Sequence, residues 1–203
     1  MGPLEAVSAI VAELGKEGYA ERVAEARRAF EKRTGAFGPE DPWFEARSRA
    51  FWDDACTSGR LARLAERAPE DARSWIAPLE RAHRGLFVVT DAEGLVVRDL
   101  VSGVELFVDE ADPGTRDALD TASAPFDGRV VAFGSPITTA LLPGAVFHPE
   151  DAAAPITKVL EAARGKGMSA GATLDALLRM ELSLRALSRV KASYAYRPEA
   201  LKG

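Results

Sequence analysis

The spacing of apolar residues changes twice along the chain and divides it into three segments. Up to about residue 84, and again from about residue 149, apolar side chains recur every three or four positions, which is typical of amphipathic helices. Between them, short β-rich runs are separated by turn residues, which favours strands. The pattern predicts an α+β protein with an N-terminal helical subdomain (1–84), a small antiparallel β-barrel or curled sheet (85–148) and a C-terminal helical arm (149–203).

Three helices are expected early in the chain, over residues 3–14, 19–35 and 42–56. Asp41 suits the N-cap of the third helix because its carboxylate can accept bonds from free backbone amides, and Pro42 suits the first helical position. The stripe expected to dock on the core consists of Phe44, Ser48, Phe51, Trp52, Ala55 and Cys56. The residues expected on an exposed face are Glu45, Arg49 and Asp53.

Two shorter helices should follow, over residues 59–67 and 69–84, the second kinked or split by Pro78. Five or six strands come next, in runs at Leu86–Thr90, Leu95–Leu100, Val104–Val108, 128–134 and 137–147. The polar connection between the third and fourth runs is rich in Asp, Pro and Gly, and no helix is expected there. Short strands joined by tight turns predict antiparallel pairing.

The chain becomes helical again after Pro149, and residues 169–190 carry its strongest helical pattern. Five leucines recur largely on one side of this segment: Leu174, Leu177, Leu178, Leu184 and Leu187. Such a face could serve as an interface between copies of the chain. The last residues, 191–203, are expected to be frayed or extended.

Composition narrows the class of protein. The 47% hydrophobic content is enough for a core, and the single cysteine, Cys56, excludes an internal disulfide framework and a cysteine-built zinc site. The N-terminus is acidic where a secretory signal begins with basic residues, and no apolar stretch approaches the roughly 18 residues of a membrane span. We therefore expect a cytoplasmic protein with no membrane partner and no cofactor.

Charge is unevenly distributed along the chain. Counting Lys and Arg against Asp and Glu, residues 1–86 have a net charge of −1, residues 87–151 of −9 and residues 152–203 of +5. The acidic middle would repel nucleic acid, whereas the basic tail could attract it. The interpretation we favour is that middle and tail attract each other, within one molecule or across a dimer.

Recognisable catalytic arrangements are not found. The only histidines, His83 and His148, have no metal-ligand spacing, and a capping, surface or structural role is expected for each. Cys56 continues the apolar face of its helix, so a buried inert thiol is expected. Asp53 and Asp54 are neighbours on a helix and point about a hundred degrees apart, so they cannot act together on one bond.

The C-terminal segment is the best binding candidate in the sequence. Its basic and aromatic residues are Arg185, Arg189, Lys191, Tyr194, Tyr196 and Arg197. Cations beside aromatic rings can hold phosphates and stack on bases, which would suit nucleic acid. The same composition also describes a helix end whose cations complement the helix dipole, with the tyrosines folded back on the body.

Residues 43–151 resemble the barrel segment of uncharacterised bacterial proteins of the SEC-C-associated group. The resemblance rests on the run "LFVVTDAEGLVVRDLVSGVELFV", in which Leu86, Phe87, Arg98, Asp99 and Gly103 match that group's strand–turn–strand pattern, and on "FWDDA", which matches its preceding aromatic helix. It implies a bacterial origin and a helical lead-in packed on a small barrel. The SEC-C zinc motif is missing here, so neither zinc nor an activity is implied.

The sequence thus favours a non-catalytic protein–protein interaction or regulatory module, which binds another protein or associates with itself. The acidic barrel face and the C-terminal helix are the expected contact surfaces. Two alternatives stay open. One is nucleic-acid binding through the basic C-terminal segment, and the other is an enzyme with a carboxylate and arginine site that sequence motifs do not reveal.

Overall fold

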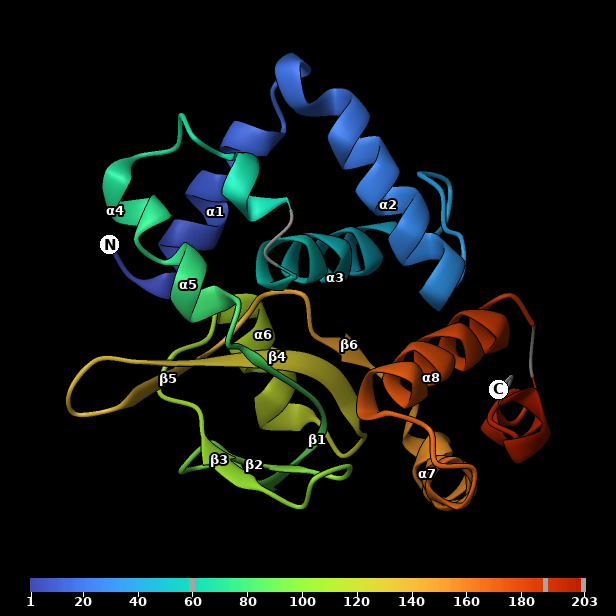
Figure 1. Ribbon diagram of the computed structural model, residues 1–203. Helices are drawn as coiled ribbons and strands as arrows, with labels where there is room; N and C mark the ends of the chain where they lie inside the picture. Colours follow the sequence, from blue (N-terminus) through green and yellow to red (C-terminus); the bar gives the residue numbers. More distant parts are fainter. Residues whose placement is uncertain (59–60, 188–189, 202–203) are drawn as a thin grey trace.

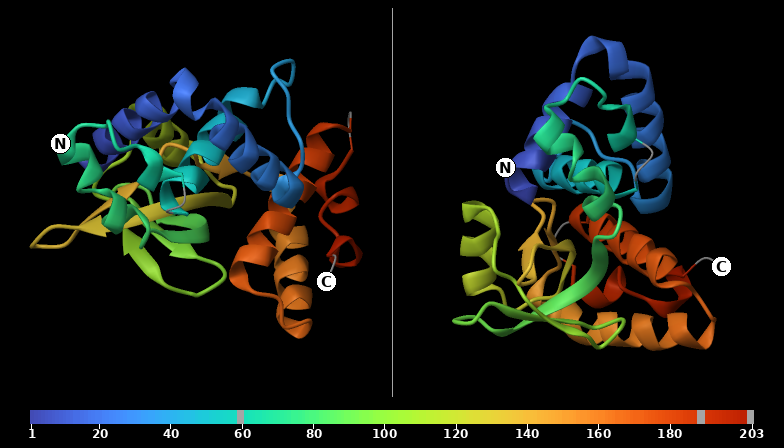
Figure 2. Two further views of the ribbon diagram at one scale, coloured as in Figure 1. Left: turned by 45° about the horizontal axis from the view of Figure 1, so that its top comes forward. Right: turned by 60° about the vertical axis from the view of Figure 1, so that its left-hand side comes forward.

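The computed structural model describes residues 1–58, 61–187 and 190–201. The predicted α+β architecture is confirmed: N-terminal helices lie over a curled antiparallel sheet, and C-terminal helices lie beside it (Figures 1 and 2). The N-terminal elements are α1 (Pro3–Leu14), η1 (Glu17–Tyr19), α2 (Ala20–Thr34), α3 (Phe44–Thr57), η2 (Ala62–Leu64), α4 (Glu70–Arg73) and α5 (Ile76–Leu79), where η denotes a 3₁₀ turn. None of the described helices is long and apolar enough to cross a membrane.

Helix α3 begins later than the sequence predicts. Asp41 does not cap it, because its carboxylate accepts a hydrogen bond from the backbone amide of Gly38 at 2.7 Å and closes a turn, while Trp43 takes the N-cap position. The predicted stripe does face the core, with Phe51 3% exposed. Asp53 contradicts the prediction of an exposed charged face, since it is only 2% exposed.

Residues 61–82 contain less helix than expected. The segment predicted as a helix over 59–67 contains only the η2 turn among its described residues. The following segment is split into α4 and α5, but the break falls between Arg73 and Ile76, so Pro78 lies inside α5 and does not cause it.

Within the described residues, six antiparallel strands form the sheet. They are β1 (His83–Asp91), β2 (Val96–Asp99), β3 (Glu105–Phe107), β4 (Phe126–Phe133), β5 (Thr138–Leu141) and β6 (Val146–Phe147). The order is β3-β2-β1-β4-β5, and β6 pairs with β4. A bridge between Glu110 and Ala140 brings the segment after β3 against β5, so the sheet curls toward a barrel. His83 opens a strand and does not end a helix.

Helix α6 (Pro113–Thr121) was not predicted, and the expectation of a helix-free connection is wrong. Its N-cap is Asp112, whose carboxylate accepts from the Thr115 amide at 3.3 Å and from the Thr115 hydroxyl. Pro113 occupies the first turn, where a missing amide hydrogen costs nothing. The helix buries Leu119 in the apolar cluster that fills the curled sheet.

The C-terminal region consists of η3 (Glu150–Ala152), α7 (Ala153–Gly165), α8 (Ala170–Arg185), η4 (Ala192–Tyr194) and η5 (Pro198–Ala200). Three leucines of α8, Leu174, Leu177 and Leu178, are at most 1% exposed because they pack within this chain. Of the predicted apolar face, only Leu187 remains largely exposed, at 49%. Most of the leucine face is therefore already covered.

Candidate functional site

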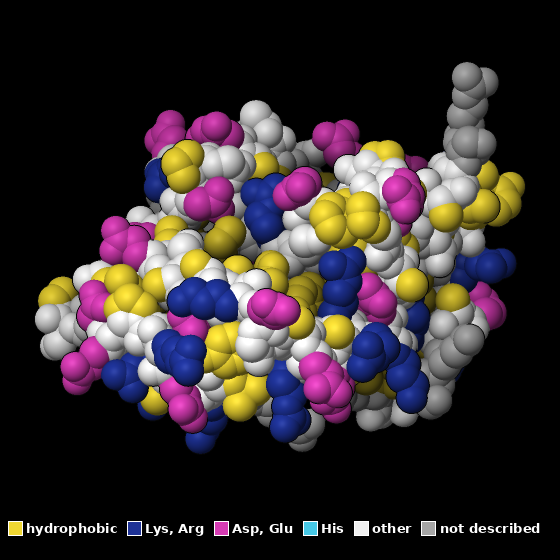
Figure 3. All heavy atoms as spheres, turned by 90° about the horizontal axis from the view of Figure 1, so that it is seen from above, with side chains coloured by type: hydrophobic (Ala, Val, Ile, Leu, Met, Phe, Trp, Pro, Cys, Tyr) yellow, Lys and Arg dark blue, Asp and Glu magenta, His cyan; other side chains and the backbone are white. Residues whose placement is uncertain are grey.

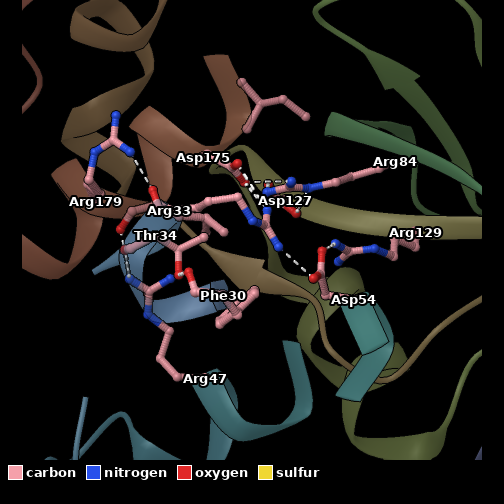
Figure 4. Close-up of polar contacts among 12 residues, drawn as sticks. Phe30, Arg33, Thr34, Arg47, Asp54, Arg84, Asp127, Arg129, Asp175 and Arg179 are labelled. Carbon is pink, nitrogen blue, oxygen red and sulfur yellow. Dashed lines mark hydrogen bonds and ion pairs between the residues drawn. The ribbon is translucent and has the colours of Figure 1, made fainter. Parts of the chain in front are cut away.

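Six charged side chains form an alternating chain of guanidinium and carboxylate groups (Figure 4). In order they are Arg129, Asp54, Arg33, Asp175, Arg84 and Asp127. We name this set the arginine–aspartate chain. It links helices α2, α3 and α8 to strands β1 and β4, and so joins both ends of the sequence to the sheet.

Asp54 connects the sheet to α2. Its Oδ1 accepts from Nη2 of Arg129 at 2.7 Å, and its Oδ2 accepts from Nη2 of Arg33 at 2.6 Å. Arg33 extends the contact to α8, because its Nη1 lies 3.1 and 3.0 Å from the two carboxylate oxygens of Asp175. Asp54 is thus held between two guanidinium groups that come from opposite directions (Figure 4).

Arg84 continues the chain back to the sheet. Its Nη1 donates to Oδ1 of Asp175 at 2.8 Å, while its Nε and Nη2 donate to the two oxygens of Asp127 at 3.2 and 2.9 Å. The second contact is the bidentate fork that matches a planar guanidinium to a carboxylate. Only 15% of the Arg84 side chain and 3% of the Asp127 side chain are exposed.

The register of the sheet explains why carboxylates are needed here. Arg84 of β1 lies directly opposite Arg129 of β4, and like charges in opposite positions repel. Asp127 lies two positions before Arg129, so alternation places it on the same face of the sheet, and Asp54 reaches that face from α3. Three carboxylates therefore balance three guanidinium groups.

The pKa values follow from burial and pairing. Burial on its own would lower the pKa of Arg84, but Asp127 and Asp175 outweigh it and raise that pKa. Burial lowers the pKa of Arg129, and the facing Arg84 lowers it further. Burial would raise the pKa of Asp175, yet Arg84 and Arg33 bring it below its ordinary value. The carboxylate of Asp175 is accordingly stabilised in its charged form.

Sequence reasoning missed the arginine–aspartate chain because its members come from five separate elements. One signal was present: Asp127 and Arg129 occupy alternate positions of an otherwise apolar strand run. Charges at alternate positions of a buried strand require partners on that face. The carboxylates and arginines of the enzyme alternative do meet here, but they are held by one another, as expected of a structural link.

Asp53 lies next to Asp54 in sequence but points into a different environment. Its Oδ2 accepts from the backbone amide of Gly144 at 2.7 Å, and burial raises the pKa of Asp53 to about 7. A Cβ at position 144 would lie 2.6 Å from the Arg49 carbonyl oxygen and from Asp53 Oδ2, so only glycine allows this approach. The two aspartates have separate partners, as their positions on α3 predict.

A second polar cluster fixes α3 and the C-terminal segment. Arg47, 1% exposed, donates through Nη2 to the Leu178 carbonyl oxygen at 2.7 Å and to that of Thr34 at 3.2 Å. His148 Nδ1 is 2.7 Å from the Tyr196 hydroxyl, and burial lowers the pKa of His148 to about 3. His148 is therefore a neutral buried residue in a structural role.

The predicted C-terminal binding residues differ in exposure. Tyr196 is only 2% exposed, whereas Tyr194 is 64% exposed, and Lys191 and Arg197 are also exposed. Arg185 bonds through Nε to Glu181. Arg189 lies outside the described residues. Nucleic-acid binding through this segment stays a prediction, with the Tyr196 ring turned into the protein.

The rim of the barrel carries large apolar side chains in solvent. Val104 is 48%, Phe107 67% and Ile137 77% exposed. Phe107 and Ile137 belong to adjoining segments, because the Phe107 carbonyl oxygen accepts from the Thr139 hydroxyl two residues after Ile137. Val104 lies at the turn between β2 and β3, where its carbonyl oxygen accepts from the Asp99 amide. Exposed acids of the same barrel are Asp91, Glu93, Glu105, Asp109 and Glu110. We name Val104, Phe107, Ile137 and these acids the barrel-rim surface.

Comparison with protein-family models, with curated proteins and with solved structures finds no match for this chain. The resemblance of residues 43–151 to the SEC-C-associated barrel segment therefore stays a prediction. The site must be interpreted from its own geometry.

Cys56 gives a direct check of the packing around α3. It is fully buried, and burial raises the pKa of its thiol to about 12. Because the thiolate is the reactive form, we expect Ellman's reagent to leave the native thiol unmodified at pH 8 and to modify it in full in denaturant. Rapid modification of the native protein would contradict the burial of this face of α3.

Proposed function

We propose that the protein is a non-catalytic interaction module that binds another protein through the barrel-rim surface. The observation that carries the proposal is the exposure of Phe107 and Ile137, at 67% and 77%, on a protein whose other phenylalanines are mostly buried. Large exposed apolar side chains rimmed by charge are typical of protein-binding surfaces. Aromatic anchors of this kind supply most of the binding energy in many interfaces.

The charge around these anchors indicates the chemistry of the partner. The barrel also exposes several carboxylates, of which Asp109 adjoins Thr139, and within the described part of the chain none of them pairs with a basic side chain of residues 152–203. A partner that presents an apolar contact among Lys and Arg side chains would match both features. A second copy of this chain would have to offer its basic C-terminal region.

Binding should depend on the apolar anchors. We expect the double variant Phe107→Ser/Ile137→Ser to lose at least tenfold in affinity for a partner captured from lysate of the source organism, because both anchors leave the interface. Leu187→Ser, which removes an apolar side chain exposed elsewhere, is the matched control and should bind like the wild type. The captured protein is identified, purified and titrated by calorimetry.

Three outcomes separate the alternatives. Equal binding by wild type and double variant would refute the barrel-rim surface as the interface. Capture that disappears after nuclease treatment would favour nucleic acid at the C-terminal segment instead. A wild-type dimer that becomes monomeric only in the double variant, measured by sedimentation, would identify the partner as a second copy.

The carboxylates of the barrel-rim surface should also contribute to binding. The variant Glu93→Gln/Glu110→Gln should reduce the affinity for a basic partner, and the reduction should be largest at low salt, where charges are screened least.

A further inference from the structure

A pocket of about 470 Å³ opens between α2, α3 and η2, away from the barrel rim. Its lining residues are Arg22, Glu25, Ala26, Ala29, Arg33, Phe51, Asp54, Ala55, Ser58, Leu61 and Leu64. The volume falls within the range of pockets that hold small molecules, roughly 300–1,000 Å³. The lining is mostly apolar, with charged groups at separate points.

The packing of α2 explains why space remains there. Its fully buried side chains, Phe30 and Thr34, lie in its C-terminal half, whereas Val23 and Ala26 are only partly buried against the core. The preceding turns contribute Ala26 and Ala29 to the pocket lining, and α3 contributes Phe51 and Ala55. The two alanines of α2 have short side chains, so they fill little of the space.

The charges of the lining are balanced, with two arginines and two acids. At one end Arg33 and Asp54 pair with each other as members of the arginine–aspartate chain, so neither offers net charge. Arg22 and Glu25 are exposed on α2, three positions apart, and within the described residues neither makes an ion pair. Figure 3 shows the molecule from above, and basic and acidic side chains are interspersed with apolar ones over the face that it presents.

We propose that this pocket binds a small zwitterion with an apolar body, the chemical class of free α-amino acids with large apolar side chains. The ligand's carboxylate would pair with Arg22 and its ammonium group with Glu25, which are the two charged lining residues that make no ion pair among the described residues. Its apolar side chain would cover Phe51 and Ala55. A ligand that carries only a negative charge would be repelled by Glu25, and one that carries only a positive charge would be repelled by Arg22.

L-phenylalanine and L-leucine are the probes, measured by calorimetry and by ligand-observed NMR on the full chain. We expect saturable binding with a dissociation constant of about 1 mM or lower. N-acetyl-L-phenylalanine lacks the ammonium charge and L-phenylalaninamide lacks the carboxylate, so each should bind at least fivefold more weakly. No saturable binding of either amino acid, or equal binding of the three phenylalanine compounds, would overturn the proposal.

Two variants with matched controls locate the site. Ala29→Trp fills the pocket and should reduce affinity at least tenfold, while Ala24→Trp places the same ring on an exposed position of α2 outside the lining and should not. Glu25→Gln should weaken the amino acids and L-phenylalaninamide, which both need a partner for the ammonium group, but should not weaken N-acetyl-L-phenylalanine, whereas Glu21→Gln should change nothing. Unchanged affinity in both Ala29→Trp and Glu25→Gln would refute this pocket as the binding site.

Discussion

Replacing Arg84 with methionine is expected to lower the free energy of unfolding by about 3–5 kcal/mol. The guanidinium group holds two carboxylates at once, Asp127 at 2.9 Å and Asp175 at 2.8 Å, and its loss leaves both without that partner in a mostly buried setting. Methionine keeps much of the side-chain volume, so the cost reports the charge and hydrogen bonds more than a cavity. Urea denaturation at pH 7 measures it.

The matched control is Arg98→Met on strand β2. Arg98 also pairs with a carboxylate, that of Glu105 at 2.6 Å, but both side chains are about half exposed, at 52% and 49%. Exposed ion pairs contribute little, so this variant should cost less than about 1 kcal/mol. Similar costs for the two arginines would show that the arginine–aspartate chain does not hold the helices on the sheet.

A double-mutant cycle tests the pairing itself. If Arg84 and Asp127 stabilise each other, the combined variant Arg84→Met/Asp127→Asn should cost at least about 1 kcal/mol less than the two single costs added together. Strict additivity would mean that each residue acts through other contacts. The cycle thus separates a cooperative link from two independent buried charges.

The secondary structure was largely predictable because it depends on local periodicity. The change from a period of 3.6 to a period near 2 falls near the start of β1. The predicted run Leu86–Thr90 lies within β1, and the next two runs contain β2 and β3. The Asp–Pro pair shows where local signals fail. At Asp112–Pro113 it starts helix α6, but at Asp41–Pro42 the carboxylate closes a turn with Gly38 instead. The same two residues serve either purpose, and the partner amide decides between them.

The candidate sites were less predictable because they depend on tertiary contacts. Arg33 and Asp175 are 142 positions apart in sequence, yet their side chains bond directly. No spacing rule connects such residues when each lies on a different element. The pocket depends in turn on the separation between α2 and α3. The amphipathic patterns of the two helices do not determine that separation. Asp53 shows the same limit. The apolar periodicity of α3 indicates only the side that packs on the hydrophobic core, whereas Asp53 is buried on another side by its contact with Gly144.

Replacing Asp53 with asparagine is expected to stabilise the protein at alkaline pH and to have little effect near pH 4. Burial raises the pKa of Asp53 from an ordinary value near 3.8 to about 7, while Arg129 and the Gly144 amide offset only part of that effect. The folded state therefore holds this proton between about pH 4 and pH 7, where the unfolded chain has released it. Stability contributed by this group falls as pH rises through that window and stays low above it.

The size of the effect follows from the shift in pKa. About three pKa units correspond to roughly 4 kcal/mol at about 1.4 kcal/mol per unit, so Asp53→Asn should be up to about 4 kcal/mol more stable than the wild type at pH 8. Asparagine keeps an oxygen that can accept from the Gly144 amide, so the contact between α3 and the β5–β6 connection is preserved. Urea denaturation from pH 4 to pH 8 gives the difference at each pH.

Asp120→Asn on the exposed side of α6 is the matched control, and it should show no gain that grows with pH. A gain for Asp53→Asn that is the same at pH 4 and pH 8 would mean that the substitution acts through packing and not through the buried proton. A loss of stability at pH 8 would mean that the charged carboxylate, bonded to the Gly144 amide and attracted by the charge of Arg129, is itself part of what holds α3 to the sheet. Asp53 would then belong with its neighbour Asp54 as an ionised link between the helices and the barrel.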